Sequence, residues 1–160
     1  MDARLIALKL FLKELGISGN ISTLPNRKLL QKAVYLGQQT GVDLGYRFGW
    51  YVRGPYSPAL TRDYYSLTEA ITAGERDYES KGFPSSVKER LSKAKALLKV
   101  PPDLDIEKPD WAELVASLHF LLQVGKYSAE EATKIIENEK PHLSQYVKQA
   151  LSHIKQNPLR

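Results

Sequence analysis

The chain has 160 residues and contains no cysteine. Disulfide bonds, thiolate nucleophiles and thiolate-bound zinc or iron–sulfur centres are therefore excluded, which suits a reducing compartment. It also lacks an apolar run of about twenty residues, so we expect no membrane-spanning helix and no membrane partner. Lys9, Lys13 and Glu14 interrupt the apolar stretch from Leu5 to Leu15, which argues against a signal peptide. The sequence predicts a cytoplasmic protein.

Recognisable catalytic and metal-binding motifs are also missing. The chain has no glycine-rich phosphate loop, no nucleophile elbow and no dinucleotide fingerprint. The three histidines lack the four-residue spacing of a zinc-protease helix; we expect His119 beside the core and His142 and His153 on the surface. An acidic loop lacks the glycine and distal glutamate of an EF-hand and should be solvated; it holds Asp103, Asp105, Glu107 and Asp110. We expect no metal, no cofactor and no enzymatic activity.

Positive charge is concentrated in the first part of the chain, although the whole chain has a formal net charge of only +5. Residues 1–62 hold nine lysines and arginines against three acidic residues, whereas residues 63–160 hold fourteen against fifteen. This asymmetry favours an acidic partner, either protein or nucleic acid, and is also common on ordinary solvated surfaces.

Hydrophobic spacing and helix-start signals predict a mainly α fold. We expect one helical bundle over residues 1–160, with about six or seven helices and a small extended or β element near residues 46–53. The expected helices cover 2–15, 26–40, 57–73, 86–99, 110–125 and 128–139, and Pro141 opens a last one. Their start signals are Asn26, Ser57 before Pro58, and capping boxes that pair Ser86 with Glu89, Asp110 with Glu113, and Ser128 with Glu131.

The second expected helix has two distinct sides. Its apolar side carries Leu29, Leu30, Ala33, Val34 and Gly37. The other side, at the same helical spacing, should form an exposed basic face with one aromatic ring; it carries Lys28, Gln31, Lys32 and Tyr35.

Residues 46–60, called here the aromatic segment, hold five aromatic side chains, although aromatics make up only 9% of the whole chain. On a strand, Phe48, Trp50 and Val52 would pack inward, and Gly54-Pro55 would turn the chain into the next helix. The residues between them would face solvent beside the basic face, and their cations and flat rings would suit a protein hot spot or a phosphate backbone; they are Arg47, Gly49, Tyr51 and Arg53. The candidate partner-binding residues are Lys28, Lys32, Tyr35, Arg47, Trp50, Tyr51, Arg53 and Tyr56, and the structural turn is Gly54, Pro55 and Ser57.

Three segments resemble a known family. Residues 28–38 read KLLQKAVYLGQ, residues 46–48 read YRF and residues 50–57 read WYVRGPYS. This pattern is similar to the YwgA-like proteins, relatives of the Panacea (SocA-type) antitoxin domain, and the likeness covers about residues 5–73. Tyr56 after Gly54-Pro55 fits the YwgA-like form better than the typical Panacea form, which has a small aliphatic residue at this position. The resemblance implies a mainly α fold without catalytic machinery, and Panacea members neutralise toxins by protein contact.

Three functions follow as hypotheses. The first is a non-catalytic protein-interaction module, such as an antitoxin or an accessory subunit of a toxin–antitoxin or anti-phage defence system. The second is a nucleic-acid-binding protein that uses the basic first part and the aromatic segment, although no known nucleic-acid-binding motif is present. The third is an enzyme whose site would include Asp63 and the arginines and tyrosines of the aromatic segment. The sequence does not define the oligomeric state.

Overall fold

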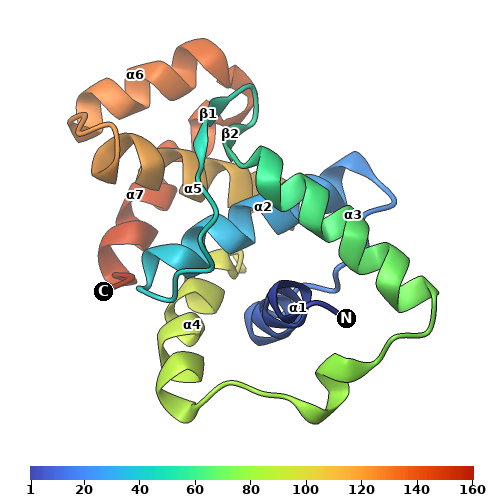
Figure 1. Ribbon diagram of the computed structural model, residues 1–160. Coiled ribbons are helices and arrows are strands. Elements are labelled where there is room, and N and C mark those ends of the chain that lie inside the picture. The colour runs from blue at the N-terminus through green and yellow to red at the C-terminus, as the bar shows by residue number, and fades with distance from the viewer.

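The computed structural model describes residues 1–160 and confirms a mainly α fold (Figure 1). It has seven α-helices, two short 3-10 helices and one antiparallel two-stranded sheet. The helices are α1 (Ala3–Leu15), α2 (Leu24–Gln39), α3 (Pro58–Thr72), α4 (Ser85–Leu98), α5 (Lys108–Gln123), α6 (Ala129–Glu139) and α7 (Val147–Gln156). The 3-10 helices are η1 (Asp77–Ser80) and η2 (Pro141–Tyr146). None of the helices is long and apolar enough to cross a membrane.

Helices α2 and α5 cross at the centre of the bundle, and the other elements pack around them (Figure 1). Residues 30–38 of α2 and 111–119 of α5 are buried without interruption, which is the pattern of a helix covered on all sides. Helices α1 and α4 cover one part of this pair, while α6 and α7 pack against α5. A single hydrophobic cluster of 33 buried residues joins these elements.

The predicted helix starts are partly right. Ser57 caps α3, and Ser128 with Glu131 forms the expected capping box of α6. The start of α2 was predicted too late, because Thr23, not Asn26, is its cap, and Pro25 lies within its first turn. The other two capping boxes are wrong: α4 and α5 begin without a side-chain cap, directly after Pro84 and Glu107.

The expected extended element is a hairpin of strands β1 (Gly49–Tyr51) and β2 (Gly54–Tyr56). Val52 and Arg53 form the turn between the strands, so Val52 is 83% exposed instead of packing inward. Gly54 and Pro55 pair with Tyr51 and Trp50 and therefore belong to a strand, not to the predicted turn.

Gly54 brings the hairpin close to α5. Its φ angle of +87° lies in the left-handed region that favours glycine. A Cβ atom at this position would also overlap the hydroxyl of Ser117 on α5. Both the backbone angle and the close approach therefore need a residue without a side chain.

Two buried glutamines of α2 hold the aromatic segment on both sides of the hairpin. The Gln38 amide accepts hydrogen bonds from the backbone of Leu44 and Tyr46 and donates one to the Tyr46 carbonyl at 2.9 Å. The Gln31 amide accepts from the Ser57 backbone at 2.9 Å and donates to its carbonyl at 3.0 Å. Side chains of α2 thus fix the backbone just before and just after the two strands.

We predict that Gly37→Ala destabilises the fold even though alanine favours a helix. A Cβ atom at Gly37 would lie 2.6 Å from Cζ of Phe11, a fully buried ring of α1. Overpacking of this kind costs about 1–3 kcal/mol, which outweighs the helix preference of about 1 kcal/mol. Urea unfolding would measure the loss. Gly82→Ala is the matched control, because no atom lies within 4 Å of a Cβ there; equal stability of the two variants would contradict the prediction.

Candidate functional site

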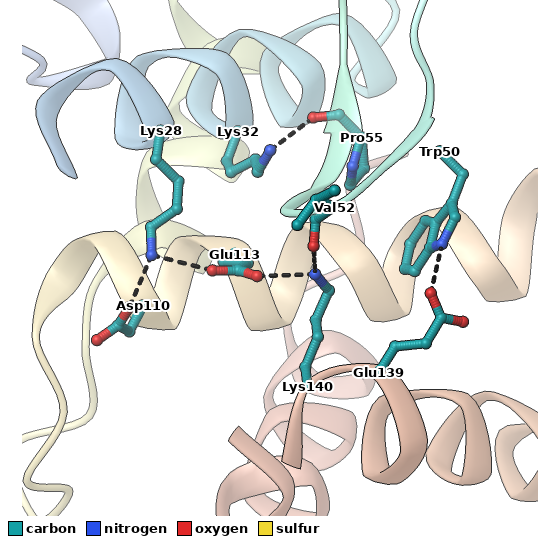
Figure 2. Close-up of polar contacts among 9 residues, drawn as sticks. All are labelled: Lys28, Lys32, Trp50, Val52, Pro55, Asp110, Glu113, Glu139 and Lys140. Atoms are coloured by element: carbon teal, nitrogen blue, oxygen red, sulfur yellow. Dashed lines mark hydrogen bonds and ion pairs between the residues drawn. The ribbon is translucent and has the colours of Figure 1, made fainter. Parts of the chain in front are cut away.

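A buried ion network lies where α2, α5, α6 and the hairpin meet (Figure 2). Its centre is Glu113 on α5, which is 3% exposed. One carboxylate oxygen accepts a hydrogen bond from Lys28 Nζ at 2.9 Å, and the other accepts from Lys140 Nζ at 2.8 Å. Lys28 also donates to Asp110 at 2.7 Å. The network thus pairs two lysines with two carboxylates.

Lysine side chains also bind the backbone of the hairpin. Lys140 Nζ donates to the Val52 carbonyl at 2.5 Å, and Lys32 Nζ donates to the Pro55 carbonyl at 2.7 Å. The Val52 carbonyl lies in the turn and the Pro55 carbonyl on strand β2, and Figure 2 shows the ammonium groups pointing to them from the end of α6 and from α2. The ion network therefore positions the hairpin as well as neutralising buried charge.

Trp50 is held by contacts within the molecule. Its indole Nε1 donates to Glu139 at 3.2 Å, its ring lies 5.9 Å from that of Phe120, and Lys140 Nζ lies 5.6 Å from its centroid. These contacts attach β1 to α5 and α6, a structural role in addition to the predicted partner contact.

The ionisable groups of the network have shifted pKa values. Burial alone would raise the pKa of Glu113, but its bonds to Lys140 and Lys28 outweigh burial and hold this pKa below its ordinary value. Burial would lower the pKa of Lys28, and its bonds to Asp110 and Glu113 reverse the effect and raise it. Lys32 has no carboxylate bond, so burial lowers its pKa from 10.5 to about 7. The negative charge of Glu113 opposes this shift, whereas the positive charges of Lys140, Lys28 and Arg53 lower the pKa further.

A concave site of about 370 Å³, called here the tyrosine groove, lies beside the hairpin. Its walls come from α2, the hairpin and α3, and its lining includes four cationic side chains and four tyrosines but no carboxylate. The lining residues are Leu24, Arg27, Lys28, Gln31, Lys32, Tyr51, Val52, Arg53, Tyr56, Thr61, Tyr64 and Tyr65. The volume lies within the range of small ligand sites, roughly 300–1,000 Å³.

The tyrosine groove also gathers most of the exposed large hydrophobic side chains. Six such side chains occur in the protein, and four of them line the groove: Leu24, Tyr51, Val52 and Tyr65. An apolar, aromatic and cationic surface is typical of protein-binding hot spots and unusual for a simple solvated face.

The structure brings five of the eight candidate partner-binding residues to the groove: Lys28, Lys32, Tyr51, Arg53 and Tyr56. Arg47 is exposed but lines a separate hollow, and Trp50 lies against α5 and α6. The prediction of an exposed basic face on α2 is wrong, because Lys32 and Tyr35 are each 1% exposed.

Tyr35 is covered by α5 and by the aromatic segment. Its hydroxyl shares a 2.9 Å hydrogen bond with Nδ1 of His119, and its ring packs edge-on against Phe48. His119 is buried beside the core as predicted, and burial lowers its pKa to about 4. His142 is exposed, whereas His153 is half-buried with its ring 5.5 Å from that of Trp111. No group of three or more His, Asp or Glu side chains is arranged to hold a metal ion.

Several residues of the site could not be singled out from the sequence. The sequence predicts only a capping-box role for Glu113 and gives no signal for Lys140, although both are central to the ion network. Arg27, Tyr64 and Tyr65 also line the groove and are not among the predicted partner-binding residues. The adjacent pair Tyr64-Tyr65 is a hint in the sequence, because neighbouring side chains on a helix point about 100° apart, so that one ring can be buried while the other stays exposed.

We predict that Glu113→Gln strongly destabilises the protein. The substitution removes the charge shared by Lys28 and Lys140 and leaves two buried ammonium groups less well neutralised. Loss of one partner of a buried ion pair costs about 3–5 kcal/mol. Chemical denaturation would measure the change, with Glu137→Gln as control because Glu137 is exposed and forms no ion pair. A loss below about 1 kcal/mol, as is usual for a surface pair, would contradict this role.

We also predict that Lys32→Met removes part of the pH dependence of stability. The folded protein holds the pKa of Lys32 at about 7, below the unfolded value of 10.5. The unfolded chain therefore binds more protons between these values, and the free energy of unfolding rises with pH in this window. From pH 7 to pH 9, wild type should gain about 2 kcal/mol relative to Lys32→Met. Urea unfolding would measure the free energy of unfolding of both proteins at each pH. An equal change with pH in wild type and Lys32→Met would disprove the prediction.

Comparisons with known proteins give no assignment: the chain matches no protein-family model, no curated protein and no solved structure.

Proposed function

We propose that this protein is a non-catalytic protein-interaction module whose tyrosine groove binds an acidic segment of a partner protein. The observation that carries the proposal is the coincidence, on one concave surface, of four exposed apolar or aromatic side chains and four cations with no carboxylate. Tyrosine and arginine are the residues most enriched in binding hot spots. The absence of carboxylates in the lining favours a partner segment that supplies them.

Arg53 is the leading contact in this proposal. It lies in the turn of the hairpin, is exposed, and forms neither a hydrogen bond nor an ion pair within the protein. An arginine without an internal partner has its full donor set free for a carboxylate. Tyr51 lies next to it in the chain and is 49% exposed, which places an apolar ring beside that charge.

The biological setting follows from the resemblance to the YwgA-like and Panacea proteins. We propose that the module acts as an antitoxin or as an accessory subunit of a toxin–antitoxin or anti-phage defence system. Its partner would be a toxin or defence effector with an acidic, partly apolar surface.

Protein is favoured over nucleic acid because several basic side chains of residues 1–62 already have partners within the fold. Lys28 is paired with two carboxylates, Lys32 is buried, and Arg4 Nε contacts Asp63 at 3.1 Å. A phosphate backbone tracks an exposed row of cations, and these side chains do not form one. Arg53 is the groove cation that is both exposed and unpaired, which suits a single carboxylate beside apolar side chains.

We predict that Arg53→Glu prevents partner capture without unfolding the protein. The full chain would be used as bait in a lysate, with and without nuclease, and the captured proteins identified by mass spectrometry. Affinity for the purified partner should fall at least about tenfold, since hot-spot arginines contribute about 2 kcal/mol or more. The thermal midpoint should stay close to that of wild type because Arg53 has no internal bond.

Arg47→Glu provides the matched control, because Arg47 is also an exposed arginine of the aromatic segment but does not line the groove. Equal loss of capture in both variants would indicate a general charge effect and contradict the groove as the binding site. Loss of all captured proteins after nuclease treatment would favour the nucleic-acid hypothesis over direct binding of a partner protein.

A further inference from the structure

Lys32 stands out among the charged groups because it is buried at the tyrosine groove without a counter-ion. It is 1% exposed, and its ammonium forms one hydrogen bond, to the neutral carbonyl of Pro55 at 2.7 Å. An ammonium has three donors and a full charge, so one carbonyl leaves it poorly compensated. Buried charges in proteins are normally paired, and this one lacks its partner.

The charged groups around Lys32 do not supply that partner. Glu113 on α5 is the only acidic group that acts on it, and both oxygens of Glu113 already accept from Lys28 and Lys140. Asp110 is bound to Lys28. The other charged groups that act on Lys32 and the other ionisable groups that line the groove are cations or phenols: Arg27, Lys28, Arg53, Lys140, Tyr51, Tyr56, Tyr64 and Tyr65. An anion entering the groove would therefore meet excess positive charge.

We propose that the tyrosine groove is a proton-coupled anion site: a carboxylate of the partner segment enters beside Arg53, and Lys32 takes up a proton as it binds. This inference rests on the proposed function for the source of the anion. The aromatic side chains receive the apolar part of the segment, and the cations receive its charge. The site is thereby selective for an anionic group carried next to an apolar or aromatic one.

The direction of the pH dependence follows from the state of Lys32 in the free protein. With its pKa at about 7, this amine is mostly charged at pH 6 and mostly neutral at pH 9. A bound anion favours the charged form and so raises the pKa of Lys32. By linkage, affinity is highest below pH 7 and falls as the pH rises through that value.

A small probe tests the site without the partner. Benzenesulfonate combines a flat ring with an anion whose charge does not change across this pH range. NMR titration of the full chain, followed through the methyl signals of Val52 and Leu24, should give saturable binding at pH 6. If the anion binds the charged amine tenfold better than the neutral one, affinity should be about tenfold weaker at pH 9. Cyclohexanesulfonate tests the contribution of the aromatic ring.

Two variants of Lys32 make the assignment specific. Lys32→Met should bind weakly and equally at both pH values, because the titrating amine is gone. Lys32→Arg carries a permanent charge and should bind equally at both pH values, with an affinity near that of wild type at pH 6. Arg53→Gln, at an exposed position, should weaken binding at both pH values and keep the pH dependence.

Three results would overturn the inference. They are no saturable binding by wild type at pH 6, equal wild-type affinity at pH 6 and pH 9, and an unchanged pH dependence in Lys32→Met. The probe does not involve the partner, so failure of lysate capture together with proton-coupled probe binding would reject the proposed function alone. Capture that depends on Arg53, together with pH-independent probe binding, would reject the proton-coupled site alone.

Discussion

The placement of the Glu113 carboxylate within the bundle is the constraint on which the rest of the structure depends. A buried charge is stable only with partners, and Glu113 has two lysines from opposite parts of the chain. Lys28 belongs to α2. Lys140 directly follows α6, and its ammonium also donates a hydrogen bond to the Val52 carbonyl of the hairpin. One carboxylate therefore fixes the relative positions of two helices and, through Lys140, of the hairpin.

The hairpin itself is too small to be stable alone. Each strand has three residues, and an isolated two-stranded ribbon is marginal in water. Its position comes from outside the sheet: two lysines bind its carbonyls, Trp50 packs against Phe120, and the small size of Gly54 lets it approach Ser117. The tyrosine groove uses this hairpin as one wall, so the shape of the groove depends on the buried lysines.

Local signals in the sequence predicted much of the fold and less of the site. Helix α1, the Ser57 cap and the Ser128 capping box were predictable because each depends on residues a few positions apart. The polar face of α2 was misplaced, because polar residues usually face water and here they face α5 and the aromatic segment. No local pattern reveals that Lys28 meets Glu113, 85 residues later, or that Gln31 binds the backbone of Ser57.

The long sequence separations within the ion network have a consequence for synthesis on the ribosome. Lys28 leaves the ribosome well before Glu113, and Lys140 follows Glu113 by a further 27 residues. Until then the nascent chain carries Lys28 without its partner Glu113 and the hairpin without Lys140, although the side chains of α2 that bind the hairpin segment are already made. The residues that line the groove, all between 24 and 65, are thus synthesised well before Glu113 and Lys140, and the groove takes its final shape only after both have left the ribosome.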